Sequence, residues 1–92
     1  MKKTVYLRNV PTDNVWLYSP TYFKVVQTGK DESFRVEVTK TGIETAETDD
    51  FFDEVHFIKD KLCRSGCDEI TRKEFDSFYI DTIRRINQFT SI

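Results

Sequence analysis

The sequence predicts a single α+β domain, in which strands occupy the first half of the chain and helices the second. Apolar residues alternate with polar ones around residues 4–8 and 34–40, a period of two that is typical of strands with one buried face. Further along the chain they recur at spacings of three and four, the period of an amphipathic helix. We therefore expect one domain over residues 1–92, with a largely antiparallel sheet of three to four strands in residues 1–42 and two amphipathic helices that cover it in residues 43–92.

The strands of the first half are separated by residues that favour turns. A strand over residues 4–8 is followed by Pro, Asp and Asn in a turn, and then by a second short strand at 15–18. The segments 22–28 and 34–40 form the clearest pair, because the residues between them, 29–33, include a glycine and suit a hairpin loop. In the second of these segments Phe and Val alternate with Arg, Glu and Thr, which predicts one buried face and one polar face.

The second half of the chain predicts two helices that lie against one face of the sheet. The first spans residues 49–64, with Thr48 as its cap and acidic residues in its first turns, where the helix dipole favours negative charge. Gly66 is suited to end it. The second helix begins at Thr71, whose hydroxyl can accept a hydrogen bond from the Glu74 amide in a capping box. The apolar stripes consist of Phe51, Val55, Ile58 and Leu62 in the first helix and of Phe75, Phe78, Tyr79, Ile83, Ile86 and Phe89 in the second.

The stretch KTVYLRNVP, residues 3–11, resembles the first strand of an RNA-recognition domain, with Tyr6 as the stacking ring. The resemblance implies a helix after this strand and, on a later strand, a basic-Gly-aromatic motif with further stacking rings. Here Pro20 interrupts the region where that helix would run, and the later strand reads SFRVEVTK, which holds no Gly-aromatic pair. The sequence therefore indicates a strand with an exposed ring and not a member of this family.

No arrangement of residues in the sequence is specific for catalysis, and we expect no catalytic residue, no bound metal and no cofactor. His56 and Cys63 are seven residues apart, about 10.5 Å along a helix, which is too far for two ligands of one zinc ion. Cys63 and Cys67 are expected to be ordinary free thiols. An enzyme or a thiol-dependent redox factor is the third class of function, and it requires an unusually reactive thiol at one of these two positions.

Composition disfavours some partners and favours others. The formal net charge of −2 argues against non-specific binding of nucleic acid, and no apolar run approaches the roughly 20 residues of a membrane span. Residues 1–42 carry seven basic and four acidic side chains, whereas residues 43–92 carry seven basic and twelve acidic ones. Eight Phe, four Tyr and one Trp are more rings than a small core readily encloses, so we expect some of them at a contact surface.

We therefore expect a non-enzymatic interaction or structural protein, located in the cytoplasm or within an assembled particle, of the kind found as virion components or accessory factors of mobile elements. Its partner is expected to be another protein or a second copy of the chain, and not a membrane. The proposed contacts are the rings of Tyr6, Trp16, Tyr18, Phe52 and Phe57. The alternative is a binder of single-stranded nucleic acid, in which rings and cations share one sheet face. That face would consist of Tyr6, Arg8, Trp16, Tyr18, Lys24 and Arg35.

Overall fold

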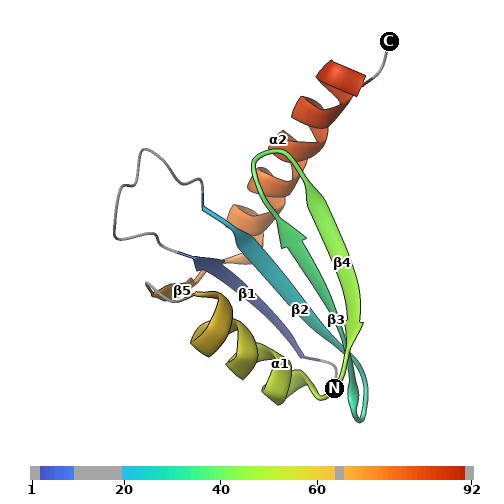
Figure 1. Cartoon of the computed structure of the whole chain (residues 1–92), viewed down its shortest axis with the longest axis vertical. Helices are drawn as coiled ribbons and strands as arrows, with labels where there is room; N and C mark the ends of the chain where they lie inside the picture. Colours follow the sequence, from blue (N-terminus) through green and yellow to red (C-terminus); the bar gives the residue numbers. More distant parts are fainter. Residues whose placement is uncertain (1–2, 10–19, 64–65, 91–92) are drawn as a thin grey trace.

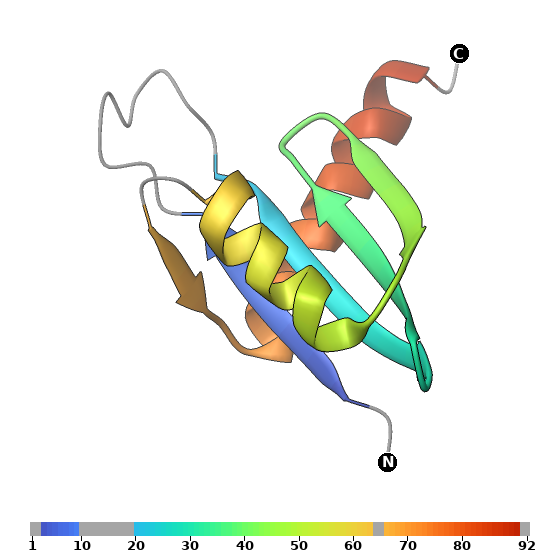
Figure 2. The same ribbon diagram turned by 60° about the horizontal axis from the view of Figure 1, so that its bottom comes forward.

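The computed structural model describes residues 3–9, 20–63 and 66–90, which form one antiparallel sheet with a helix on each of its faces (Figures 1 and 2). The α+β class is confirmed, whereas the sheet that these residues form has five strands in place of the expected three to four. The elements in chain order are β1 (Thr4–Asn9), β2 (Tyr22–Gly29), β3 (Glu32–Val38), β4 (Ile43–Thr48), α1 (Phe51–Phe57), η1 (Ile58–Leu62), β5 (Cys67–Glu69) and α2 (Arg72–Thr90).

All neighbouring strands of the sheet are antiparallel, in the order β4-β3-β2-β1-β5. The predicted hairpin is confirmed as β2 and β3, but its loop is shorter than expected, because β2 runs to Gly29 and β3 begins at Glu32. A register shift between Gln27 and Gly29 accommodates this tight connection. The strand predicted at 15–18 lies outside the described residues.

Two strands lie in the half of the chain that was predicted to be helical, so the boundary at residue 43 is wrong. β4 follows a tight turn, closed by a hydrogen bond of 2.9 Å from the Thr39 amide to the Gly42 carbonyl oxygen, and it pairs with β3 along its whole length. Its sequence, IETAET, has the β-branched residues of a strand, although two glutamates make it polar. β5 is a short strand beside β1. The sheet therefore ends on β4 at one edge and on β5 at the other.

The two helices cover opposite faces of the sheet, which corrects the expectation that both lie against one face (Figure 2). Successive side chains of a strand point to opposite faces, and β1 carries apolar side chains on both. Leu7 packs on the α1 face, whereas Tyr6 packs on the α2 face, with its ring centroid 5.5 Å from that of Phe75. The buried clusters consist of Leu7, Phe23, Val25, Phe51, Ile58 and Cys63 on the α1 face and of Val38, Ile70 and Phe75 on the α2 face.

Each helix begins where a side chain caps its first amides. α1 is capped by Asp50 and not by Thr48, which ends β4; the Asp50 carboxylate accepts hydrogen bonds from two amides of the first turn, at 2.9 and 3.2 Å. α2 has the predicted cap, because the Thr71 hydroxyl accepts a hydrogen bond of 3.2 Å from the Glu74 amide. α1 continues through the π-helical η1 to Leu62, so the predicted apolar stripe of this helix faces the sheet as expected.

α2 crosses the sheet and then extends beyond it (Figure 1). The helix starts beside the middle of β1, where the Ile70 amide donates to the Tyr6 carbonyl oxygen at 3.0 Å. Further along, the buried Thr82 hydroxyl donates to the Thr39 carbonyl oxygen at 2.7 Å, at the turn between β3 and β4. Eight residues of the helix, about two turns, follow Thr82, and the turn residues Lys40 and Thr41 lie beside Arg85 and Phe89 there.

Candidate protein-interaction surface

Four large apolar side chains of the described residues are exposed, two on each helix. Phe52 and Phe57 on α1 are 58 % and 45 % exposed, and Ile80 and Phe89 on α2 are 47 % and 71 % exposed. Phe52 and Phe57 do not belong to the apolar stripe predicted for the first helix, and their exposure agrees with that, whereas their role in binding stays a prediction. Exposed apolar side chains mark contact surfaces when they gather, so their grouping decides what they can bind.

Phe89 is the most exposed of these side chains, although its place in the predicted stripe of α2 implied burial; that expectation is wrong. It shares the helix side of Phe75 and Thr82, which are buried against the sheet. Beyond the turn between β3 and β4, no described strand covers this side of the helix (Figure 1). A hollow of about 270 Å³ lies beside Phe89 and is also lined by Thr41, Arg85, Ile86 and Thr90. We call Ile86, Phe89 and this hollow the α2 end.

The exposed rings of α1 point to different sides of the helix. Because an α-helix turns by about 100° per residue, positions 52 and 57 lie about 140° apart. Phe52 faces the start of β1, where Lys3 Nζ lies 4.3 Å from its ring centroid in a cation–π contact. A hollow of about 430 Å³ beside Phe52 is lined in part by Val5 and His56. α1 therefore offers two separate rings and not one continuous surface.

The aromatic part of the expected sheet surface is covered in part by α2. Tyr6 lies half-buried on the α2 face beside Phe75, and Lys24 Nζ lies 5.6 Å from its ring centroid. Trp16 and Tyr18 lie outside the described residues. Tyr6 therefore contributes to the packing of α2, and its role as a partner-binding ring stays a prediction.

The cations of the nucleic-acid alternative lie on both faces of the sheet. Arg8 and Lys24 share the α2 face. Arg8 Nη2 lies 3.0 Å from Asp68 Oδ2, and this hydrogen bond raises the pKa of the guanidinium. Arg35 points to the α1 face, where its Nη1 lies 2.6 Å from Glu54 Oε1. A strand of nucleic acid bound on the α2 face cannot reach Arg35. The residues predicted for nucleic-acid binding therefore do not form one surface.

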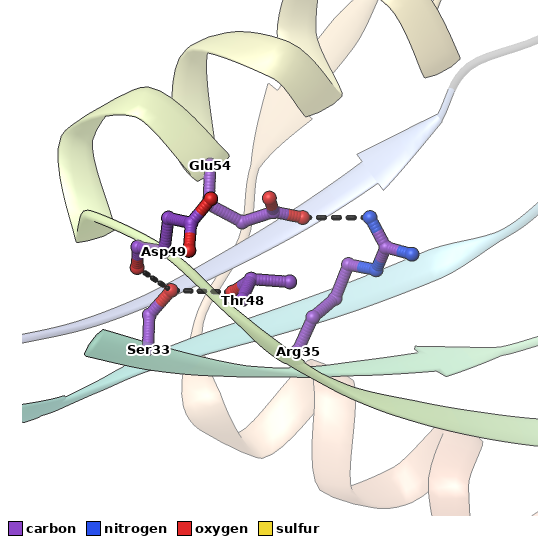
Figure 3. Close-up of polar contacts among 5 residues, drawn as sticks. All are labelled: Ser33, Arg35, Thr48, Asp49 and Glu54. Carbon is purple, nitrogen blue, oxygen red and sulfur yellow. Dashed lines mark hydrogen bonds and ion pairs between the residues drawn. The ribbon is translucent and has the colours of Figure 1, made fainter. Parts of the chain in front are cut away.

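Polar contacts join α1 and the segment before it to the sheet (Figure 3). The side chains of Arg35 and Glu54, which are 23 % and 11 % exposed, link β3 to α1. The buried Ser33 hydroxyl lies 2.5 Å from the Thr48 hydroxyl and donates to the Asp49 carbonyl oxygen at 2.9 Å. Both sets of contacts join the sheet to α1 or to the residues just before it, so they hold α1 on the sheet.

Two carboxylates face each other on the α1 face at the β4 edge. Glu37 on β3 and Glu44 on β4 are directly opposite in the register. Burial raises the pKa of Glu37, Arg35 opposes this shift, and Glu44 adds to it. Glu44 raises the pKa of Glu37 both through its negative charge and through a side-chain hydrogen bond between the two carboxyl groups, so the pair favours the protonated form of Glu37.

Cys63 and Cys67 are free thiols at the point where η1 ends and β5 begins. Cys63 is buried in the cluster on the α1 face, and Cys67 packs against that cluster. Burial, and after it the Cys67 thiol, raise the pKa of Cys63 to about 12. A thiol acts as a nucleophile after it has lost its proton, so Cys63 does not have the lowered pKa of a catalytic cysteine.

Alkylation with iodoacetamide should therefore leave Cys63 largely unmodified in the folded chain. Near pH 8 we expect Cys63 to react at least about tenfold more slowly than free cysteine, because its raised pKa and its burial both reduce the reactive thiolate. Mass spectrometry of the peptides over a time course measures the rate at each thiol, and unfolding in denaturant provides the control in which Cys63 becomes reactive. Faster reaction at Cys63 than in free cysteine would contradict this prediction and favour a thiol-dependent function.

Comparison with other proteins does not assign this chain to a family. Profiles of protein families, curated proteins and solved structures give no match to this chain. In the described part of the chain, no group of three His, Cys, Asp or Glu side chains is placed to hold a metal ion. Over the same residues, no helix has the length and apolarity that crossing a bilayer requires. A functional proposal for this chain therefore depends on its exposed side chains and strand edges.

Proposed function

We propose that this chain is a small non-enzymatic interaction protein, which binds a partner protein or a second copy of itself as part of a larger assembly. The observation that carries the proposal is Phe89, which is 71 % exposed on the helix side that buries Phe75. A helix side that is apolar along both its covered and its uncovered length can extend the same packing to another polypeptide. The α2 end is the main contact in this proposal, and Phe52 and Phe57 on α1 supply further apolar contacts.

The surroundings of Phe89 support a protein as the partner. Arg85 borders the same hollow, and its guanidinium is held by a hydrogen bond of 2.7 Å from Nη1 to the Lys40 carbonyl oxygen. Aromatic and Arg side chains are enriched at the energetic centres of protein interfaces, where a fixed side chain loses less entropy on binding. An exposed ring beside an anchored guanidinium therefore fits a protein interface.

The substitution Phe89→Ser in the full chain tests this proposal by sedimentation. We expect the wild-type chain to self-associate with rising concentration and the variant to associate about thirtyfold more weakly, because truncation of a central interface ring commonly costs about 2 kcal/mol. Gln88→Ser is the matched control, since it introduces the same residue at the neighbouring exposed position of α2. Association of the control should equal that of the wild-type chain.

If the wild-type chain is a monomer at high micromolar concentration, the contact has to be with a different protein. The same two variants are then compared by affinity purification from the cells that encode this chain. A protein that is retained by Gln88→Ser and lost from Phe89→Ser supports the proposal. Identical partners for both variants, or none for either, would contradict it.

A further inference from the structure

The outer edge of β4 carries backbone groups that point away from the described sheet. β4 is the last strand of the sheet, with β3 as its neighbour. In an antiparallel pair, residues bonded to the neighbouring strand alternate with residues whose amide and carbonyl groups point outward. The hydrogen bond from the Thr39 amide to the Gly42 carbonyl oxygen sets this alternation. The outward groups therefore belong to Ile43, Thr45 and Glu47.

The edge strand β4 carries one glutamate on each face of the sheet. Glu44 is exposed on the α1 face, directly opposite the half-buried Glu37 of β3, and Glu47 is exposed on the α2 face. Arg35, the cation that acts on Glu37, is itself bound to Glu54 at 2.6 Å. The edge consequently presents a negative field to whatever approaches it.

A hollow with a largely apolar lining lies beside the edge on the α2 face. Its volume is about 310 Å³, and it is lined by Ile43 and Thr45 of β4, Phe34 and Val36 of β3, Lys24 of β2, and Phe75, Asp76 and Tyr79 of α2. Every second side chain of a strand added to β4 would point to this face. Small or apolar side chains at those positions would therefore lie at the mouth of the hollow.

We propose that the β4 edge binds an extended, basic segment of a partner polypeptide, which adds a strand to the sheet. Backbone hydrogen bonds to the outward groups of Ile43, Thr45 and Glu47 provide the attachment, as in other complexes formed by strand addition. A Lys or Arg opposite Glu44 lies on the α1 face and neutralises the facing pair of Glu37 and Glu44. The alternate side chains of the segment, which face the hollow, are small or apolar. This site is separate from the α2 end and does not depend on it.

The charges favour this occupant over a second copy of the chain. If the β4 strands of two copies paired edge to edge, Glu44 and Glu47 of both copies would lie close together. β4 itself carries no Lys or Arg that could offset these four negative charges. Glutamates on an edge also prevent such pairing, but that role requires charges on the edge strand itself. Glu37 lies on the inner strand β3, half-buried and directly opposite Glu44, where a cation beside the pair would stabilise both carboxylates. A basic ligand accounts for Glu37, and protection of the edge does not.

A basic peptide and the full chain test the proposal by amide hydrogen exchange followed by NMR. The probe is a capped peptide of about ten residues that alternates lysine with valine or threonine. We expect the amides of Ile43, Thr45 and Glu47 to exchange rapidly in the free chain and at least about tenfold more slowly with the peptide bound. The amides of β5, at the opposite edge, should not change. Binding should weaken as salt is added, because the attraction between exposed charges is screened.

Two substitutions separate the backbone contacts from the charge. Thr45→Pro removes an outward amide that does not bond to β3, so peptide binding should be lost while thermal unfolding shows that the chain still folds. Glu44→Gln should weaken binding by about two- to fivefold, the usual effect of one cross-strand charge pair. Glu69→Gln makes the same change on β5 and should leave binding unchanged. If Thr45→Pro does not fold, the two Gln variants still decide the outcome.

Three results would overturn the proposal. The first is an absence of protection in β4 at millimolar peptide. The second is equal protection by a peptide in which glutamate replaces lysine. The third is protection of β4 that rises with the concentration of the chain alone, which would assign the edge to a second copy. None of these results bears on the α2 end, which Phe89→Ser tests independently.

Discussion

Phe75→Ala should lower the free energy of unfolding by about 3 to 5 kcal/mol, the usual cost of deleting a buried aromatic ring. Phe75 is 3 % exposed, and its ring centroid lies 5.5 Å from that of Tyr6 and 6.2 Å from that of Tyr79. Its removal leaves a cavity between α2 and the sheet, on the face that α1 does not cover. Denaturant unfolding followed by circular dichroism measures the loss.

Phe89→Ala is the matched control, because it makes the same change on the same side of the same helix. Phe89 is 71 % exposed, and substitutions at exposed positions usually change the free energy of unfolding by no more than about 0.5 kcal/mol. Equal losses at the two positions would mean that Phe89 is covered in the free chain. That result would contradict the exposed α2 end, so the same pair of variants also checks the basis of the proposed function.

Local sequence patterns predicted the elements whose structure depends on nearby residues. The alternation of Phe34, Val36 and Val38 identified β3, and the Thr71 hydroxyl identified the start of α2. β4 was not predicted, because Glu44 and Glu47 make its sequence similar to the acidic residues that often precede a helix. Its strand conformation comes from pairing with β3, and strand propensity depends strongly on such tertiary context.

The arrangement of the helices on opposite faces depends on β5, which is too short to show a pattern. After α1 the chain passes along the edge of the sheet beside β1 as β5 and then enters α2 on the other face. The sequence did contain one indication of two covered faces, since Val5, Tyr6 and Leu7 are three consecutive apolar residues within β1. A strand buried on both faces has such a run, whereas a strand with one buried face alternates.

Some residues of the candidate sites could be found from local sequence patterns, whereas others depend on contacts between distant parts of the chain. The exposure of Phe52 and Phe57 followed from helix periodicity, which gives the side of a helix on which a residue lies. Periodicity does not show how much of the helix is covered by the sheet, so the exposure of Phe89 could be recognised only in the structure. The facing carboxylates of Glu37 and Glu44 also required it, because they meet through the register of β3 and β4.

Glu54→Ala should have the second-largest effect and lower the free energy of unfolding by about 2 to 3 kcal/mol. Its carboxylate lies 2.6 Å from Arg35, with side chains 11 % and 23 % exposed, so the substitution leaves a largely desolvated guanidinium without its ion-pair partner and with Glu37 as a charged neighbour. Removal of one partner from a fully buried ion pair costs about 3 to 5 kcal/mol, and the partial exposure of Arg35 reduces this value. The loss should loosen α1 from β3, which faster amide exchange in α1 would report.

An exposed ion pair supplies the control for this effect. Arg8 and Asp68 are joined at 3.0 Å, but their side chains are 35 % and 55 % exposed, so Asp68→Ala should cost no more than about 1 kcal/mol.

Replacement of both Arg35 and Glu54 by Met and Leu should recover much of the stability lost in Glu54→Ala, because it removes the unpaired charge and fills the same space. Equal costs for Glu54→Ala and Asp68→Ala, or no recovery in the double variant, would contradict the view that burial gives the Arg35–Glu54 pair its importance. The recovery should also appear as restored protection of the α1 amides, since the helix is then held on β3 by apolar contact.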